Sequence, residues 1–452
     1  MQFMRLKHFF FLLMVLGGMV CRAQVTFGGN GKPVFEETPA KSTGLGKIYV
    51  LYNTAGVSMS YTAQSPSATV VWSTYGDRGA AYAQEITSGI TRNGAQLTLA
   101  QVMPNTGYVI EEGTKRTYVW IVNYADYRLN IQNIATEPAS DCGTATLNVQ
   151  GTGTDMAFFT ITGVRQLLDR GIKLHYYTLS WNDSQQQWGQ TEVNENQETF
   201  KSTIVVSAPL CNTAFRLSGD RFLQYWGEGV EIESDSYTTN AVDVHTSAVQ
   251  EKRNNNNEKG SGGEGTLGGS APAHITFTAH VTDAAIHKEW QMATDAEFQN
   301  VELRLNNDVV DQTFEQAGTF YWRFIGSNAS GTCEAVSETY TVNIGESELV
   351  CPNVFTPGTT EGVNDEWKVS YKSIVEFKCC IYNSWGNLIV ELNDPSQGWD
   401  GKYKGKLVGS GVYYYVLRAK GSDGKKYDLS GDINIIGYKK NPNGTGTTPT
   451  GQ

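Results

Sequence analysis

Short runs rich in Val, Ile, Thr and Tyr recur along almost the whole chain, and polar turn residues separate them. Runs of about four to eight such residues are typical of β-strands. Helical periodicity is scarce and favours only short helical turns at Gly163–Arg170 and Lys288–Gln299. We therefore predict an all-β fold made of tandem β-sandwiches. The clearest strand-like runs are Lys47–Tyr52, Thr69–Ser73, Thr117–Asn123, Thr144–Val149, Thr203–Ser207 and Thr339–Ile344.

The most polar and glycine-rich stretch lies near the middle of the chain, at Gln250–Ala273. It contains four consecutive Asn residues followed by GSGGEG and LGGSAPA, a composition too polar to bury a core. We predict that it is a flexible linker between two halves, with further boundaries near Pro138 and at Gly345–Leu349. The predicted units are sandwiches at 24–138 and 139–249, the linker at 250–273, a sandwich at 274–348, a terminal sandwich at 349–438 and a disordered tail at 439–452.

The module at 274–345 ends in two strand-like runs that indicate a particular kind of sandwich. GTFYWRF (318–324) is followed by a turn at Ser327–Ser330 and then by SETYTVNI (337–344). This order resembles the last two strands of an immunoglobulin-like (Ig-like) sandwich, as in the PKD-type or fibronectin-like repeats of Bacteroidetes surface proteins. The resemblance implies an architecture rather than a function.

The first residues have the pattern of a secretory signal peptide. A basic start precedes the apolar run Phe9–Val20, which is shorter than the about 20 residues that a spanning helix needs. We expect cleavage between Ala23 and Gln24; lipoprotein processing at Cys21 is the alternative, although the residue before it is larger than that peptidase prefers. No later segment is long and apolar enough to cross a bilayer, so we predict export without membrane insertion.

The net charge limits the possible partners, and the length of the chain limits the number of domains. The chain has 46 acidic and 35 basic residues and a formal net charge of −11. Such a surface repels nucleic acid and anionic lipid, so we predict that neither is a partner. A chain of 452 residues is too long for one core and is expected to form about four domains of roughly 100 residues each.

Cysteine usage agrees with an oxidising compartment. Six of the seven cysteines lie beyond the expected cleavage site, and an even number is typical of disulfides. Grouping by predicted domain favours the pairs Cys142–Cys211 and Cys351–Cys379, and buried free thiols are the alternative. Because C-x-x-C spacing is absent and His is scarce, we predict neither a metal site nor a cofactor.

Six short motifs follow one another within the last hundred residues: CPNVFTP (351–357), GVNDEW (362–367), IYNSWGN (381–387), GWDGKYKG (398–405), GVYYYV (411–416) and SGDINII (430–436). Their succession resembles the gliding-motility-associated C-terminal domain, the type B sorting domain of type IX secretion. The resemblance implies a β-sandwich that is recognised by the type IX translocon and an associated outer-membrane β-barrel. The residues that match the family motifs are Pro352, Asn353, Phe355, Pro357, Asn364, Asp365, Trp385, Gly386, Trp399, Asp400, Gly401, Gly411, Tyr413, Tyr415, Gly431 and Ile433.

The residues of this segment also predict how it packs. In Val412–Leu417 both alternating sets of side chains are apolar or aromatic, which is typical of a strand covered on both faces. We predict that Trp385 and Trp399, each beside a glycine, close the ends of the sandwich. The loop 358–362 differs from the family's Asn-Gly-Asp-Gly turn, so a calcium site in relatives would not transfer to this chain.

Sequence signatures of common catalytic sites are absent: there is no G-x-S-x-G elbow, no H-E-x-x-H motif and no phosphate loop. Trp181 and Trp188 flank a polar loop and could bracket a sugar, but aromatic residues at strand ends more often cap a core. We predict a protein that is not an enzyme, with a secreted carbohydrate-active enzyme as the remaining catalytic alternative.

Two non-catalytic functions fit these features. In the first, the chain is a structural or binding protein at the cell surface or in the medium, with a glycan or a protein as its ligand. In the second, it is an accessory component of the secretion or gliding machinery, retained at the outer-membrane translocon barrel. Both require export through the periplasm.

Overall fold

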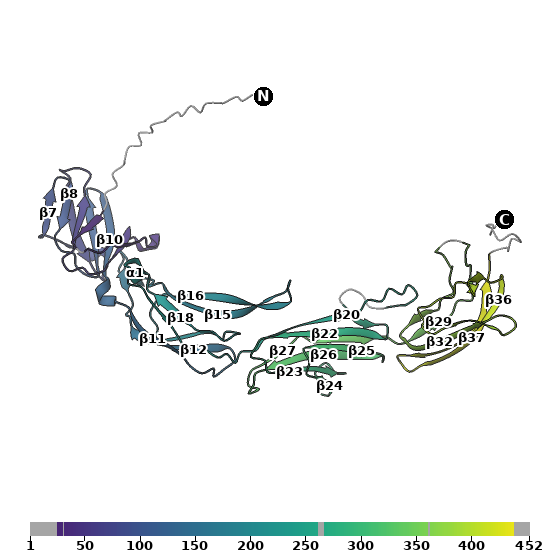
Figure 1. The fold of residues 1–452 in the computed structure, drawn as a ribbon. Coiled ribbons are helices and arrows are strands. Elements are labelled where there is room, and N and C mark those ends of the chain that lie inside the picture. The colour runs from purple at the N-terminus through teal and green to yellow at the C-terminus, as the bar shows by residue number, and fades with distance from the viewer. Residues whose placement is uncertain (1–24, 30, 261–265, 360–361, 438–452) are drawn as a thin grey trace, which may run out of the picture.

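The computed structural model describes residues 25–29, 31–260, 266–359 and 362–437. Strands dominate, and they form four β-sandwich units that follow one another along a curved row (Figure 1). This confirms the predicted all-β class. The expected cleavage site at Ala23 and Gln24 and the tail 439–452 lie outside the described residues. Within those residues no helix is long and apolar enough to cross a membrane.

The first unit packs a four-stranded sheet against a six-stranded sheet. In β4, Met59 and Tyr61 point into the core while the Ser and Thr residues between them face outward, which is the period of a half-buried strand. The first sheet has the order β1 (Val25–Gly28), β4 (Ser58–Thr62), β8 (Gln96–Leu99) and β7 (Ile90–Asn93). The second has the order β2 (Phe35–Glu37), β3 (Lys47–Leu51), β10 (Lys115–Asn123), β9 (Thr106–Glu112), β5 (Val70–Tyr75) and β6 (Gln84–Glu85), with short 3-10 helices at Lys41–Thr43, Ala80–Tyr82 and Tyr124–Tyr127.

The second unit begins earlier than the sequence predicts. Strand β11 (Asn130–Thr136) was expected in the first unit, but it pairs with β12 (Thr144–Thr152), which assigns it to the second. The two main sheets are β11, β12 and β17 (Thr203–Ser207), and β16 (Gln187–Gln197), β15 (Ile172–Asn182), β18 (Arg216–Gly219) and β19 (Val230–Glu233). The unit also contains the hairpin β13 (Ala157–Phe159) and β14 (Arg165–Leu167) and the helix α1 (Arg221–Tyr225). The helical turn predicted at Gly163–Arg170 is wrong, because β14 occupies it.

The first two units share one hydrophobic core. Trp120, on the outer face of the six-stranded sheet, and Tyr124, in the 3-10 helix after β10, belong to the same buried cluster as residues of β12 and α1. At this junction Arg170 and Asp220 form an ion pair of 2.8 Å, and both side chains are fully buried. The Tyr124 hydroxyl donates to the Asp220 carboxylate at 3.1 Å. The ion pair itself lies within the second unit, and it bonds to the first through the Tyr124 hydroxyl and through Arg170, which donates to Tyr127 O at 2.7 Å. The shared core and these hydrogen bonds hold the two units together.

The third unit contains the segment that the sequence predicts as a linker. Strand β20 (Val244–Gln250) pairs directly with β22 (Ala273–Val281), so the residues between them form a loop within one sandwich rather than a connection between two halves. The linker prediction is wrong because a polar loop within one domain has the same composition as a polar linker between two domains. The sheets are β20, β22 and β25 (Val309–Phe314), and β21 (Leu267–Gly269), β28 (Tyr340–Ile344), β26 (Gly318–Ser327), β23 (His287–Ala293) and β24 (Val301–Leu305), with β27 (Glu334–Val336) beside β26. Strand β23 also replaces the helical turn predicted at Lys288–Gln299.

Two contacts join the second unit to the third. A disulfide links Cys142 to Cys333, across 191 residues of sequence. The predicted pair Cys142–Cys211 is therefore wrong, and Cys211 is a free thiol. At the tip of the β15–β16 hairpin, the Trp181 ring stacks on His245 of β20, with ring centroids 4.4 Å apart. Since Trp188 lies on Trp181 at 5.4 Å, the two rings pack against each other and the third unit rather than standing open to bracket a sugar.

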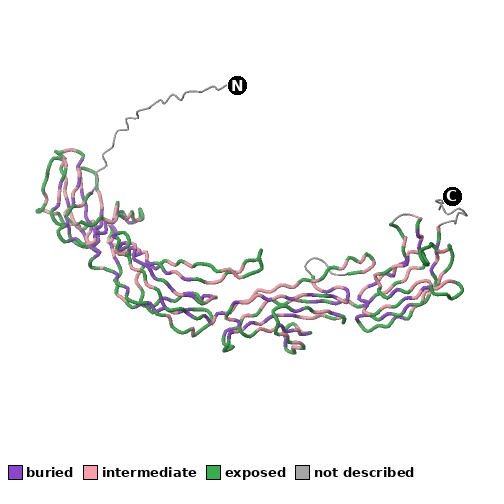
Figure 2. Tube along the Cα trace, in the orientation of Figure 1, coloured by how far each residue is buried: buried purple, intermediate pink, exposed green. Residues whose placement is uncertain are grey.

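The fourth unit is built around one five-stranded sheet. Its order is β30 (Val354–Phe355), β37 (Lys426–Ile435), β36 (Gly411–Gly421), β32 (Ile374–Tyr382) and β33 (Leu388–Leu392). Two small sheets accompany it: β29 (Glu348–Val350) with β31 (Ser370–Lys372), and β34 (Lys402–Tyr403) with β35 (Lys406–Leu407). Figure 2 shows that buried residues run through the middle of each unit along the row.

The Asn-rich part of the β20–β21 loop fastens the third unit to the fourth. Asn257 donates through its amide nitrogen to the carbonyl oxygens of Val369 at 2.9 Å and Pro395 at 2.8 Å. The backbone of the loop also pairs with Tyr371, which donates to Asn257 O at 3.0 Å. The run of Asn residues is thus an ordered clamp on the terminal unit.

Replacing Asn257 by alanine is expected to weaken this clamp by about 1 to 3 kcal/mol, because two partly buried hydrogen bonds of about 0.5 to 1.5 kcal/mol each are lost. Amide hydrogen exchange at Tyr371 reports the change, since that amide bonds to the clamp. Asn256→Ala is the matched control, because Asn256 is exposed in the same run and is expected to shift stability by less than about 0.5 kcal/mol. Equal exchange rates in both variants would contradict the clamp.

Candidate functional site

The sequence motifs of the fourth unit meet in an aromatic cluster within its core. Phe355 of β30 and Trp399 are buried, with ring centroids 5.3 Å apart, and Tyr413 of β36 lies 5.1 Å from Trp399. Trp367 lies 5.3 Å from Tyr415 on the same strand. Four motifs that are far apart in the sequence therefore build one core.

Backbone bonds fix the two buried tryptophans of this cluster. Trp367 and Trp399 form an antiparallel bridge in which each amide donates to the other's carbonyl, at 2.9 and 3.0 Å. The Trp367 indole nitrogen donates to Pro352 O at 2.6 Å, and that of Trp399 donates to Lys402 O at 3.0 Å. Burial of an indole N–H is tolerated because each has its acceptor. Trp367 is the last residue of the GVNDEW motif, but the sequence analysis did not predict a role for it.

The two acidic motif residues organise turns. The Asp365 carboxylate accepts from Gly358 N at 3.1 Å and from Gly362 N at 2.6 Å, so it closes the loop after the Phe-Thr-Pro motif. Asp400 accepts from Lys402 N at 3.0 Å within its own turn. Both carboxylates are thus engaged in holding backbone. Within the described residues, no group of three or more His, Cys, Asp or Glu side chains could hold a metal ion.

The remaining motif positions are set by close backbone approach. Gly401 has φ of +72°, and a Cβ there would lie 2.8 Å from the ring of Pro357. Gly431 lies opposite Tyr415, and a Cβ there would lie 2.8 Å from the tyrosine ring. These glycines are needed because a larger side chain would displace the aromatic cluster. Among the other motif residues, Ile433 is buried opposite Tyr413, and Gly411 begins β36. The carbonyl oxygen of Asn353 accepts a hydrogen bond from Asn434 N, and that of Asn364 accepts one from Thr356 N.

Two packing predictions for this unit are wrong. Trp385 does not close the sandwich: it stands with Gly386 in the β32–β33 turn, and its side chain is 85% exposed. Strand β36 is central in the sheet, but only its inner face is covered. Val412, Tyr414 and Val416 on the other face are each exposed by more than two fifths. An apolar side chain does not by itself reveal whether a second layer covers it, which is why the sequence misled here.

The cysteines of the fourth unit are free thiols, so the predicted pair Cys351–Cys379 is not formed. Burial raises the pKa of Cys379 to about 12, with a smaller contribution from the neighbouring Cys351. Burial also raises the pKa of Cys351. Neutral thiols are weak nucleophiles, so these residues contribute packing rather than reactivity.

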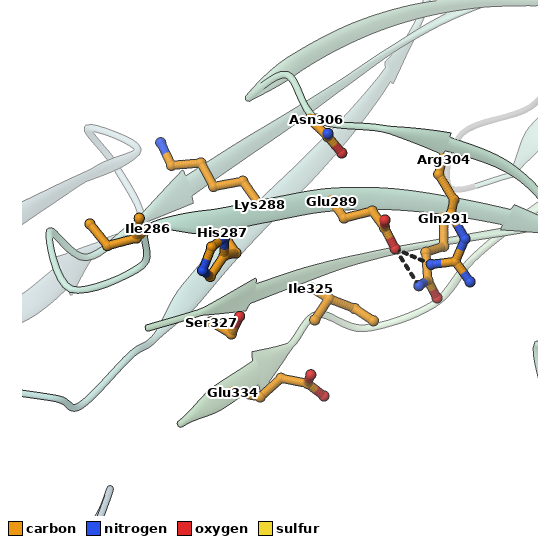
Figure 3. Close-up of a pocket in the computed structure, with 10 residues that line it drawn as sticks. All are labelled: Ile286, His287, Lys288, Glu289, Gln291, Arg304, Asn306, Ile325, Ser327 and Glu334. Carbon is orange, nitrogen blue, oxygen red and sulfur yellow. Dashed lines mark hydrogen bonds and ion pairs between the residues drawn. The ribbon is translucent and has the colours of Figure 1, made fainter. Parts of the chain in front are cut away.

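A polar groove of about 580 Å³ lies on the third unit, over the outer face of β23, β24, β26 and β27 (Figure 3). The Glu289 carboxylate pairs with Arg304 and accepts from Gln291 at 2.6 Å. Gln291 in turn accepts from Arg323 at 2.9 Å. Because these side chains satisfy one another, the groove offers a fixed hydrogen-bonding surface of mixed charge. The groove could not be predicted from the sequence, because its residues are spread over four strands.

The lining of the groove is mostly polar. Asn306 and Glu334 stand at its edges, and Ile286 and Ile325 add small apolar areas. The lining contains no Trp, Tyr or Phe side chain, and its one ring is the imidazole of His287. His287 of β23 and Ser327 of β26 lie opposite each other in the lining, and the His287 imidazole bonds to Ala329 O at 3.2 Å.

Comparisons with known families agree with this architecture. Residues 349–435 match the family model described as the CHU_C type IX secretion signal domain, and residues 134–234 match that of the fibronectin type III domain. The chain therefore carries a type IX secretion signal domain at the predicted place, which indicates export by that system to the cell surface or the medium. The fibronectin type III match falls on the second unit, whereas the sequence analysis noted such a likeness in the third. No curated protein matches the chain.

Solved structures of tandem domains align over much of the chain at low similarity. A tetra-tandem repeat from the extending region of a large adhesion protein is 10% identical, with a TM-score of 0.21, covering 86% of this chain and 99% of that one. Three N-terminal domains of the bacteriophage RB49 outer capsid protein Hoc are 9% identical, with a TM-score of 0.22, covering 69% and 99%. Dimeric latent PorU from Porphyromonas gingivalis is 9% identical, with a TM-score of 0.16, covering 72% and 36%.

Proposed function

We propose that this chain is a non-enzymatic structural or binding protein that the type IX secretion system exports, and that its sandwiches form a stiff rod ending in the sorting domain. The strongest support is that each unit makes specific contacts with the next unit along the row. A shared core and the hydrogen bonds of the buried Arg170–Asp220 pair to Tyr124 and Tyr127 join the first two. A disulfide and a stacked ring join the second and third, and the Asn clamp joins the third and fourth.

A stiff rod is suited to presenting one end at a distance from the other. Independent sandwiches joined by flexible linkers would not hold such a separation. In this chain the sorting domain lies at one end of the row, and the shared core of the first two units lies at the other (Figure 1). The first two units are therefore the part held farthest from the point of attachment, and the groove of the third unit provides a surface for a glycan or protein ligand.

Truncation before Cys351 is expected to leave the protein in the periplasm, because the sorting domain is then removed. Fractionation of cells into periplasm, surface and medium measures the result. Removal of residues 439–452 alone is the matched control and is expected to preserve export, since the whole matched domain remains. Truncated protein found outside the cell would contradict the export proposal.

A second experiment, deletion of the gene, distinguishes this proposal from the alternative that the chain is an accessory component of the secretion machinery. Deletion of the gene is expected to leave other type IX cargo at the surface if the chain is itself cargo. If the other cargo stalls in the periplasm, the chain belongs to the machinery, and purification of the native protein should then recover an outer-membrane barrel with it.

A further inference from the structure

Exposed apolar side chains are concentrated on the fourth unit. Among the described residues, 11 of the 22 exposed large apolar side chains belong to this unit, although it holds only about a fifth of those residues. Single exposed apolar residues are ordinary on protein surfaces, but a concentration of them marks a surface that binds another molecule.

Strand register brings several of these side chains into one patch. Tyr414 of β36 lies directly opposite Tyr382 of β32, which lies opposite Leu388 of β33. Residues directly opposite in antiparallel strands share a face of the sheet, so these three side chains form a row across it. Val412 and Val416 stand two residues either side of Tyr414 on the same face. We call these five residues the outer patch.

Trp385 extends the patch at the edge of the sheet. It lies in the turn that joins β32 to β33, three residues after Tyr382. The turn is held by Asn383, whose side-chain oxygen accepts from Trp385 N at 3.1 Å and from Asn387 N at 2.9 Å. A fixed turn presents the indole in one place, although 85% of its surface is exposed. Because nothing in the fold requires a tryptophan there, its exposure fits a contact with a partner.

The other side of the unit is already covered. The Asn clamp of the third unit pairs with Tyr371 of β31 and bonds to Val369 and Pro395. The buried core lies between that side and the inner face of the five-stranded sheet. The outer face of β36, β32 and β33 is therefore open, and at the end that holds Tyr414, Val412 and Val416 it is apolar.

We propose that the outer patch and Trp385 are the surface by which a protein of the type IX secretion machinery binds the sorting domain. This inference rests on the proposed export. The partner surface is apolar or aromatic at its centre, to match Tyr414 and Trp385. At its rim it is polar, to match Arg418, Asp428 and Asp432 on the same face of β36 and β37. An interface with an aromatic centre and a charged rim is the usual arrangement for specific protein binding.

The test uses the full chain with Tyr414→Lys or Trp385→Ser, expressed in its own cells. Each variant is expected to reduce the amount of protein outside the cell by about tenfold or more, the size of effect typical of losing one interface hot spot, while the protein accumulates in the periplasm. Val309→Lys is the matched control, because Val309 is a similarly exposed strand residue of the third unit. The control is expected to be exported at the wild-type level.

Folding and self-association are measured on the same variants. Trp385→Ser removes an exposed turn side chain, so an unchanged melting temperature is expected and separates lost binding from lost folding. Normal export of both variants would overturn the inference, as would an equal loss of export in Val309→Lys. A dimer of the purified wild-type chain that Tyr414→Lys dissociates would assign the patch to a second copy and overturn it too. If truncation before Cys351 does not block export either, it is the export proposal that fails.

Discussion

Replacing Cys142 and Cys333 together by serine is expected to lower the free energy of unfolding by about 5 kcal/mol. The disulfide closes a loop of 191 residues, and the entropy that a cross-link removes from the unfolded chain grows with the length of the loop. Because the bond joins two units, its loss should also let the second and third units move relative to each other.

Calorimetry of the mature protein measures the loss of stability, and limited proteolysis of the segment between β19 and β20 measures the loosening of the junction. Cys211→Ser is the control, because Cys211 is a free thiol of the second unit and is expected to have a small effect. If the double variant melts as the wild type does and the junction resists protease equally, the stacked Trp181 and His245 rings alone hold the two units.

The architecture could be predicted from the sequence because strand alternation is a local signal. In β22, Ala273, Ile275 and Phe277 are buried while the residues between them are less so, and this period can be read without knowing what covers the strand. The terminal domain could be predicted for a different reason. Its motifs resemble a known family in order and spacing, and the family model matches residues 349–435. The contact of Phe355 with Trp399 was not predicted, because it depends on how the motifs pack.

The contacts between units could not be predicted because they depend on how whole units are placed. Cysteine pairing by domain failed for Cys142, whose partner lies in the next unit. The Asn run reads as a linker by composition, yet Asn257 finds two carbonyl acceptors on a unit more than a hundred residues away in sequence. Such partners are invisible until the fold is known.

Exposure of the outer patch was missed for a related reason. Alternating apolar residues on both faces of Val412–Leu417 predict two covering layers, and the structure supplies only one. Apolar side chains that the fold leaves exposed are expected at binding surfaces, where another molecule covers them. The mistaken prediction thus falls on the surface that we propose as the binding site.

Replacing Arg170 by methionine is expected to destabilise the joined first and second units by about 3 to 5 kcal/mol, the cost of breaking a buried ion pair from one side. The substitution leaves Asp220 fully buried without its cation. It also leaves two carbonyl oxygens, of Thr154 and Tyr127, without the guanidinium donors that lie 2.7 Å from each. Methionine fills a similar volume, so the loss comes from electrostatics and hydrogen bonds rather than from a cavity.

Arg128→Met is the matched control for that change. Arg128 also bridges the first two units by pairing with a carboxylate, that of Glu228 at 2.8 Å, but its side chain is about half exposed. Exposed pairs contribute about 0 to 1 kcal/mol, so this variant should be nearly as stable as the wild type in urea unfolding. Equal losses in both variants would show that burial of Arg170 does not set the stability of the junction. A large loss in Arg170→Met alone, together with protease sensitivity near Tyr127, would show that the buried pair is what makes the two sandwiches one rigid end of the rod.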